Sequence, residues 1–245
     1  MNRETTNRIR FVLEDIVPPI LRDSKAFKAL ASLAWGQHIG DLASFRARAP
    51  FLTDEEYEAL YKMHPRVHEG TDNSKACIEQ IIKDVAGESV CDVGCGTGIL
   101  LKKIKANRPN ITRLMGVDFA IDDADALDGI EYEASKIEQL PFKDGEFDTV
   151  ICTHVIEHVL DYRAAIAELR RITKKRLIIV VPREREYRYT FNPHFNFFPY
   201  THSFLRAMQP VPKNYKIKDI ARDIYYREEI EGIGQDSADI LQAAE

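Results

Sequence analysis

The residues best suited to chemistry form two short groups, one rich in glycine and one rich in histidine. The first is Asp92-Val-Gly-Cys-Gly-Thr-Gly98, in which glycine occupies every second position from 94 onward. Glycine permits positive φ angles and allows a ligand to approach the main chain closely. A helix predicted to begin at residue 98 would add unpaired N–H groups at the same place. This group is therefore predicted to hold a small ligand against bare backbone.

The spacing of these glycines narrows the class of ligand. The dinucleotide-binding pattern is G-x-G-x-x-G, and the third glycine here comes one residue too early for it. A phosphate-binding P-loop would need Gly-Lys-Ser/Thr, which is absent from the run. Asp118, twenty residues after Gly98, ends a second predicted strand. In doubly wound folds an acid at that place accepts hydrogen bonds from ribose hydroxyls, although an ordinary turn residue is the alternative.

The second group is His154-Val-Ile-Glu-His158, which directly follows an apolar predicted strand. If the chain turns helical after that strand, residues 154, 157 and 158 share one face. Histidine nitrogen and carboxylate oxygen atoms in such a group suit a divalent metal ion. A histidine there could instead remove a proton from an acceptor, with His158 as the first candidate and His154 as the second. The third possibility is structural, with His158 only orienting the loop.

Neither the histidines nor the cysteines indicate a zinc protein. The segment 154–158 formally matches the H-x-x-E-H pattern of one class of metalloprotease. We reject a protease, because the segment follows a sheet strand in a cofactor-binding fold and does not lie inside a long helix. The four cysteines show no C-x-x-C or zinc-type spacing, so they are expected to be small buried residues in a reducing cytoplasm.

The elements that must position both groups alternate between strand and helix. Strands are predicted over 89–93, 113–118, about 130–134, 147–153 and 176–181. Helices are predicted from the N-cap Ser74 to Gly87, over 98–107, weakly near 121–127, and after the N-cap Asp161. This alternation indicates an α/β fold of Rossmann-like, doubly wound type, with a mostly parallel sheet of about seven strands. Ligands of such sheets bind outside the carboxyl ends of the strands, which is where both groups fall.

The regions before and after this core are predicted to be a helical extension and an aromatic-rich cap. Helices are expected over 4–17, 24–35 and 54–62, and they form either a packing extension or a lid over the substrate. Residues 191–204 are rich in aromatic side chains, 215–230 could supply the last strands, and 235–245 could be a small polar helix or a frayed tail. The predicted division is 1–72 for the extension, 73–182 for the core, and 183–245 for the cap and final strands.

Composition excludes two broad classes of function. With a formal net charge of −5, the 245-residue chain is unlike a dedicated nucleic-acid binder, whose affinity depends on neutralising phosphates. No apolar run has the form of a signal peptide or the length of a membrane span. A hydrophobic content of 44% is enough for a packed core. The expectation is one large domain in the cytoplasm.

From Asp92 to Pro182 the sequence resembles the broad family of class I S-adenosylmethionine (SAM)-dependent methyltransferases. The resemblance rests on D-x-G-x-G-x-G at 92–98, Glu138-Gln-Leu-Pro-Phe142 before Asp144-Gly-Glu-Phe-Asp148, Val155-Ile-Glu-His158, and Ile178-Ile-Val-Val-Pro182. It implies SAM as cofactor, held by Asp92, Gly94, Cys95, Gly96, Gly98, Asp118, Ile137, Glu138 and Thr153. Lys136 departs from the family pattern, because it occupies the usual position of an aspartate that contacts adenine.

The histidine group resembles a more specialised pattern within the same class. Metal-dependent O-methyltransferases that act on RNA ribose or on quinone precursors carry E-x-x-E-H and a distant histidine. The resemblance implies a Mg²⁺ or Mn²⁺ ion held by His154, Glu157, His158 and His202, with His194 as a less favoured source of the fourth ligand. His154 stands where those enzymes have a glutamate, which favours an ion that prefers nitrogen ligands, or no ion.

The expected activity is O-methylation of a small-molecule or glycan acceptor. The favoured acceptor is a sugar hydroxyl of a surface polysaccharide, on the basis of the segment Asn196-Phe-Phe-Pro-Tyr200. A small aromatic or quinone-type molecule is the alternative, RNA is disfavoured by charge, and a SAM-binding subunit without catalysis is the alternative of another class. Aromatic residues of 191–204 could form an acceptor wall, and Arg183, Arg185 and Arg188 would suit an anionic acceptor if they face the cleft.

Overall fold

A computed structural model describes residues 8–9, 11–35, 46–53, 55–57, 59, 70–119, 129–186, 188 and 193–230. Within them, seven strands form one sheet in the order β3-β2-β1-β4-β5-β7-β6. The strands are β1 Ser89–Val93, β2 Arg113–Asp118, β3 Glu131–Ala134, β4 Phe147–Thr153, β5 Thr173–Pro182, β6 Tyr215–Ile220 and β7 Asp223–Glu229. The first five are parallel, and β7 is antiparallel to both of its neighbours. The predicted Rossmann-like, mostly parallel sheet is confirmed.

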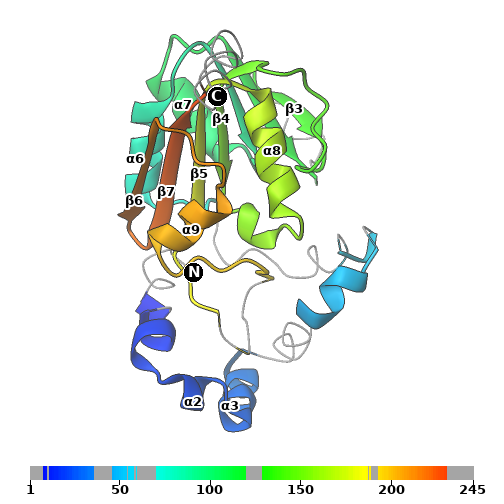
Figure 1. Cartoon of the computed structure of the whole chain (residues 1–245), viewed down its shortest axis with the longest axis vertical. Helices are drawn as coiled ribbons and strands as arrows, with labels where there is room; N and C mark the ends of the chain where they lie inside the picture. Colours follow the sequence, from blue (N-terminus) through cyan, green and yellow to red (C-terminus); the bar gives the residue numbers. More distant parts are fainter. Residues whose placement is uncertain are drawn as a thin grey trace, which may run out of the picture.

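Helices cover both faces of this sheet (Figure 1). The helices of the core are α6 Lys75–Asp84, α7 Ile99–Asn107 and α8 Tyr162–Ile172. Buried side chains of α6 and α7 pack on one face, and those of α8 pack on the other. The central strand β4 is buried along its whole length, as expected for a parallel strand between two helical layers. The strand ends beside the candidate ligand groups are therefore held by a rigid core.

Polar side chains begin two of these helices as the sequence predicts. Ser74 Oγ accepts a hydrogen bond from Cys77 N at 3.1 Å, and Asp161 Oδ1 accepts one from Ala164 N at 3.1 Å. One boundary differs from the prediction, because β5 begins at Thr173 directly after α8, three residues earlier than expected. The Thr173 hydroxyl donates back to Leu169 O at 2.5 Å and ends the helix without an intervening loop.

The carboxyl-terminal part contains α9 Thr201–Ala207 and the last two strands. The strands predicted within 215–230 are confirmed as β6 and β7. The Arg170 guanidinium on α8 forms a two-pronged ion pair with the buried Glu228 on β7, at 2.7 and 2.8 Å. This pair joins the helix to the antiparallel edge of the sheet. The predictions for 121–127 and 235–245 lie outside the described residues.

The amino-terminal part is helical where it is described. It contains η1 Val12–Ile16, α2 Pro19–Arg22, α3 Lys25–Trp35 and η2 Ala49–Phe51. The predicted helix over 24–35 is confirmed, whereas Pro19 begins a new helix and does not merely end the preceding one. Thr53 and Glu56 exchange the hydrogen bonds of a capping box, at 2.9 and 3.3 Å. Figure 1 shows α2 and α3 beyond one end of the sheet.

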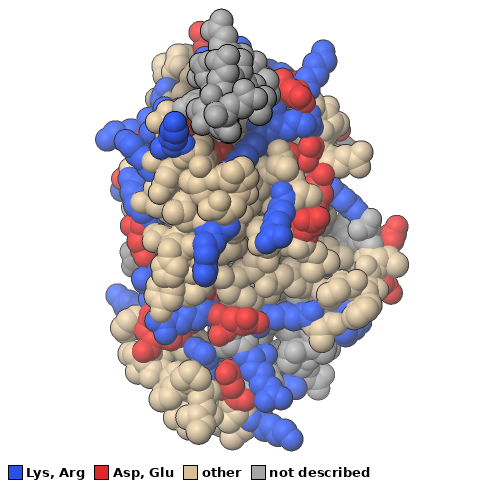
Figure 2. Space-filling model, in the orientation of Figure 1, with Lys and Arg blue, Asp and Glu red and all other residues tan. Residues whose placement is uncertain are grey.

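Charge is mixed over the described surface of the molecule that Figure 2 shows. Lysine and arginine side chains are interspersed there with aspartate and glutamate. Such a surface lacks the continuous basic stripe of a nucleic-acid interface. Among the helices that the structure describes, none combines the length and the apolar character needed to cross a membrane.

Candidate functional site

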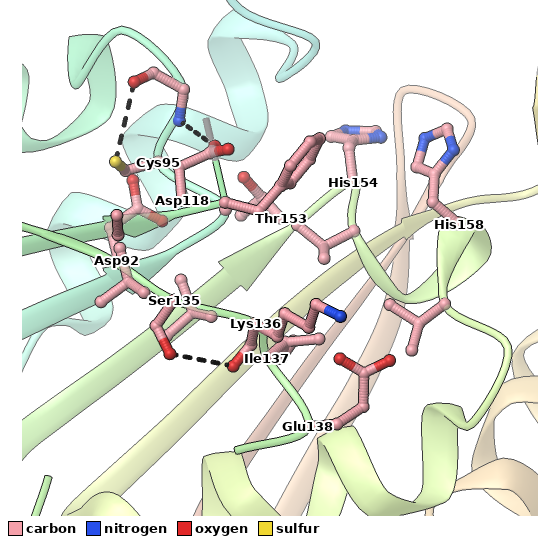
Figure 3. A pocket seen from close by; sticks show the side chains of 18 of the residues that line it. Asp92, Cys95, Asp118, Ser135, Lys136, Ile137, Glu138, Thr153, His154 and His158 are labelled. Carbon is pink, nitrogen blue, oxygen red and sulfur yellow. Dashed lines mark hydrogen bonds between the residues drawn. The ribbon is translucent and has the colours of Figure 1, made fainter. Parts of the chain in front are cut away.

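A cavity of about 930 Å³ lies at the carboxyl ends of β1, β2 and β4. Its lining comes from six stretches of the chain, within 49–57, 70–73, 92–100, 117–119, 134–139 and 153–160. In Figure 3, Asp92, Cys95 and Asp118 occupy one end of this cavity, and His158 occupies the other. The cavity therefore brings together the two groups of residues singled out in the sequence.

The glycine run is shaped in a way that side chains would prevent. Gly94 and Gly98 have φ angles of 82° and 70°, in the region that favours glycine. A Cβ on Gly94 would lie 2.1 Å from Val155 Cγ2, and one on Gly98 would lie 2.2 Å from Tyr132 Oη. The N–H of Gly94 donates to Val117 O at 2.7 Å, which fastens the loop to β2. The backbone of this loop forms the floor of the cavity.

Asp118 connects the end of β2 to the same loop. Its Oδ2 atom accepts a hydrogen bond from Gly96 N at 2.8 Å, and its side chain lines the cavity. The glycine loop and the acid are therefore one hydrogen-bonded unit, which agrees with the ligand-binding interpretation of both.

Asp92 is the most unusual group at this end of the cavity. The residue is only 2% exposed, and its Oδ1 atom has no hydrogen-bond partner among the described residues. Burial, together with the nearby carboxylate of Asp118, raises the pKa of Asp92 to about 7. A buried carboxylate with an unpartnered oxygen suits a ligand that brings positive charge.

The ionisation of Asp92 leads to a prediction about stability. Its folded pKa of about 7 lies above the ordinary value of 3.8, so the protonated folded form is favoured and the stabilisation is lost as the pH rises through 7. An asparagine side chain at this position cannot ionise. Asp92→Asn is therefore expected to raise the free energy of unfolding at about pH 8 by about 2–4 kcal/mol, with little change at about pH 4. Urea unfolding at both pH values measures this, and an equal effect at both would contradict it.

The connection after β3 lines the opposite wall of the cavity. Ile137 is 7% exposed, and Lys136 and Glu138 beside it also line the cavity. The Ser135 hydroxyl donates to Gln139 O at 3.0 Å and holds the connection in a compact turn. This places the predicted binding residues Ile137 and Glu138 on the cavity, with Lys136 at the position where the family pattern has aspartate.

Thr153 and His154 end β4 at the centre of the site. Thr153 Oγ1 accepts a hydrogen bond from Asn73 Nδ2 at 2.8 Å. His154 has a φ angle of 57°, an uncommon conformation for a residue other than glycine. Its ring lies between two buried carboxylates, with Nδ1 3.5 Å from Glu157 Oε1 and Nε2 3.9 Å from Asp223 Oδ2. The strained backbone turns this ring away from the line of the strand.

His158 ends the short helix η4 Ile156–His158 and lines the cavity. Its Nδ1 atom lies 3.0 Å from Pro193 O. A carbonyl oxygen can only accept a hydrogen bond, so Nδ1 carries the proton and Nε2 is the basic nitrogen of the neutral ring. Burial, and then the neighbouring His194, lower the pKa of His158 to about 4. The ring is therefore neutral at physiological pH.

The predicted group of metal ligands is assembled differently from the expectation. The helical turn begins only at Ile156, so His154 lies before it and outside the closest cluster. That cluster consists of Glu157, His158 and His194, with one ligand atom from each within 4.8 Å of the others. His202 is not brought to it, because its exposed ring stacks on Tyr200 with centroids 5.1 Å apart.

The carboxylate of Glu157 is ionised within this cluster. Burial opposes ionisation, but contacts with His154 and the nearby rings of His158 and His194 hold the pKa of Glu157 below its usual value. His194 in turn is paired with the buried Glu184, with 2.6 Å between Nδ1 and Oε2. Two carboxylates and three imidazole rings therefore meet beside the cavity.

Several residues of the site were not found from the sequence. Asn73 holds Thr153, and the Tyr57 hydroxyl donates to His158 O at 2.8 Å. Asn196 Nδ2 donates to Ile156 O and Val159 O, at 2.8 and 2.7 Å. Only His194 carried a signal, as the less favoured source of a metal ligand. The others have side chains that are common in loops.

Two expectations about the acceptor receive no support from the geometry. None of the described residues within 191–204 lines the large cavity; several of them line a separate hollow of about 460 Å³ beside α8 and α9. Arg183 pairs with Asp219 at 3.1 Å, and Arg185 contacts the Tyr200 hydroxyl at 3.4 Å. These arginines do not line the cavity either.

Comparison with known proteins gives a consistent family. Residues 91–181 match the model of a family described as a methyltransferase domain. A ubiquinone biosynthesis O-methyltransferase of Erwinia tasmaniensis is 29% identical over 55% of this chain and 56% of its own length. The chain spans 28% to 58% of the length of the curated relatives it matches.

Two solved structures share the fold at lower identity. A SAM-dependent methyltransferase of Aquifex aeolicus has a TM-score of 0.53 at 14% identity, covering 71% of this chain and 98% of its own. The PH0226 protein of Pyrococcus horikoshii has a TM-score of 0.54 at 14% identity, covering 72% and 99%. These two likenesses support the fold.

Proposed function

We propose that this chain, whose residues 91–181 form a class I SAM-dependent methyltransferase domain, transfers a methyl group to a hydroxyl oxygen of a small molecule. The observation that carries the proposal is the single cavity, which joins the glycine loop to His158. One end supplies the features expected of a cofactor site, and the other supplies a neutral imidazole. Positioning both reactants in one cavity provides much of the acceleration for an in-line displacement.

The cofactor end of the cavity fits SAM by shape and by charge. The residues that would hold it are Asp92, Gly94, Cys95, Gly96, Gly98, Asp118, Ile137, Glu138 and Thr153. Within this set, the unpartnered oxygen of Asp92 favours the positive charge of SAM, and Asp118 is suited to ribose hydroxyls. Ile137 offers a buried apolar surface for the adenine ring. When bound, SAM supplies an electrophilic methyl group on a sulfonium.

His158 is the residue that would activate the acceptor. Its Nδ1–H group is directed to Pro193 O, so Nε2 is the atom that receives a proton from the acceptor hydroxyl. Three contacts hold the ring and its backbone in place, from Pro193 O, from the Tyr57 hydroxyl to His158 O, and from the His194 ring. His154 is the second candidate, because it lines the same cavity.

The apolar lining favours a small aromatic or quinone-type acceptor. Leu52, Tyr57, Phe119, Val159 and Leu160 offer apolar surface to the cavity. A flat aromatic ring fits such a lining better than a sugar does, because fewer hydroxyls must lose water. The relatives named ubiquinone biosynthesis O-methyltransferase support the same class. A sugar hydroxyl of a polysaccharide is the second candidate, carried by the segment Asn196–Tyr200.

Calorimetry with SAM and with S-adenosylhomocysteine tests the cofactor site, and the expected result is binding of both. Asp92→Asn is expected to weaken SAM more than S-adenosylhomocysteine, which lacks the sulfonium charge. Release of S-adenosylhomocysteine is then measured with phenol, catechol, sugar, nucleotide-sugar and RNA acceptors. Binding without turnover on any acceptor would favour the non-catalytic subunit, and no binding of either compound would refute the proposal.

A further inference from the structure

We infer that Glu157, His158 and His194 bind one divalent transition-metal ion at the wall of the cavity. The ion's binding is independent of the methyl-transfer proposal, but its role beside the acceptor rests on that proposal. The inference differs from the expected set of ligands, which contained His154 and His202 and not His194. It is carried by three observations about these side chains and their partners.

The first observation is the convergence of three ligand atoms. One from each residue lies within 4.8 Å of the other two, a separation over which one ion can contact all three. The residues come from two segments that are far apart in the sequence, η4 and the stretch around His194. Backbone hydrogen bonds clamp the segments together, since Phe195 N and Asn196 N donate to Glu157 O at 2.7 and 3.1 Å.

The second observation is that both imidazole rings are oriented from behind. Metal-bound histidines usually direct their other ring nitrogen to a carboxylate or a backbone carbonyl. His158 Nδ1 faces Pro193 O at 3.0 Å, and His194 Nδ1 faces Glu184 Oε2 at 2.6 Å. Each ring thus has its Nδ1 side occupied by an acceptor and its Nε2 side available to an ion.

The third observation is an oxygen atom of Glu157. The residue is 1% exposed, and its Oε2 atom has no hydrogen-bond partner in the described part of the chain. His154 contacts the other oxygen, Oε1, at 3.5 Å. Leaving a buried carboxylate oxygen without a partner is costly, and a bound cation would remove that cost.

The chemistry of these ligands selects the kind of ion. Two imidazole nitrogens and one carboxylate oxygen suit Mn²⁺, Fe²⁺, Co²⁺ or Zn²⁺, whereas Mg²⁺ prefers oxygen ligands and retains several waters. Because His158 also lines the cavity, an ion in this cluster would lie beside the proposed acceptor site. Its chemical contribution there would be to polarise the acceptor oxygen.

Metal titration of the tag-free, full-length protein tests this inference. The protein is first stripped with EDTA, and Co²⁺, Zn²⁺, Mn²⁺ and Mg²⁺ are then titrated by calorimetry, with visible absorption as a second measurement for Co²⁺. We expect one ion per chain and binding of Co²⁺ and Zn²⁺ at least about 100-fold tighter than Mg²⁺. Absence of saturable Co²⁺ and Zn²⁺ binding would overturn the inference.

Variants locate the ion. Glu157→Gln and His194→Ala are expected to weaken Co²⁺ binding by more than about 100-fold, and Glu184→Gln by about 10- to 100-fold. His202→Ala is the matched control, because His202 is exposed and outside the cluster, and it should bind as the unmodified protein does. Binding that persists in both Glu157→Gln and His194→Ala would overturn the assignment. Thermal unfolding confirms that each variant is folded, with His194→Gln as a second choice.

The outcome is separable from that of the proposed function. SAM binding is measured on the same stripped protein, since none of the three proposed ligands belongs to the predicted cofactor-binding residues. Retained SAM binding without metal binding refutes only the metal site. Retained metal binding with no binding of SAM or S-adenosylhomocysteine refutes only the proposed function.

Discussion

Replacing His158 with alanine is expected to lower turnover by about 10²- to 10⁴-fold, with a change of less than about twofold in the affinity for SAM. The physical reason is the position of the ring, which lines the acceptor end of the cavity and has its Nδ1 atom against Pro193 O. Removing it takes away the atom that activates the acceptor, whether Nε2 acts as a base or as a metal ligand. The glycine loop and Asp118 remain intact.

Two measurements check this prediction. S-adenosylhomocysteine release at saturating SAM gives turnover, and calorimetry gives the SAM dissociation constant. His202→Ala is the matched control, because it removes an exposed histidine whose ring stacks on Tyr200 outside the cavity. If His158→Ala loses SAM affinity as strongly as it loses turnover, the ring is structural, which is the third possibility that the sequence left open.

Replacing Arg170 with alanine is expected to lower the free energy of unfolding by about 3–5 kcal/mol. Arg170 contacts both carboxylate oxygens of Glu228, at 2.7 and 2.8 Å, and donates a further hydrogen bond to Met208 O at 2.8 Å. Glu228 is fully buried, so loss of the guanidinium leaves a buried charge with only the Tyr226 hydroxyl at 2.6 Å to stabilise it. The cost is mainly that of the remaining carboxylate.

Urea unfolding measures this effect, and two further variants test its cause. Arg170→Met combined with Glu228→Leu removes both charges and is expected to regain most of the loss. Lys75→Ala breaks the exposed Lys75–Glu79 pair, whose side chains are 92% and 66% exposed, and is expected to change stability by less than about 1 kcal/mol. A double variant no more stable than Arg170→Ala would show that lost packing, and not the uncompensated charge, causes the effect.

The sequence by itself determined the core of this protein. Apolar runs such as the one ending at Val93 predict buried strands, and Ser74 and Asp161 predict the starts of their helices. These signals are local, because hydrophobic periodicity and capping depend only on residues a few positions apart. The glycine loop and Asp118 also follow from local order, since parallel strands bring their carboxyl ends to one edge.

Only the tertiary structure decided which residues surround His158. Its partners His194 and Pro193 lie beyond β5 in the sequence, and Tyr57 lies before β1. No periodic pattern joins them, because they come from loops whose positions depend on packing over the finished sheet.

The same reason separates His194 from His202. Both histidines lie in one aromatic-rich stretch of the sequence, and composition does not distinguish them. Asn196 anchors the start of this stretch to η4 through Ile156 O and Val159 O, which brings His194 beside His158. His202 lies on α9, where its ring is exposed and stacked on Tyr200. The glycine loop could be found from the sequence because its function depends on local backbone shape, whereas the histidine cluster depends on a long-range contact.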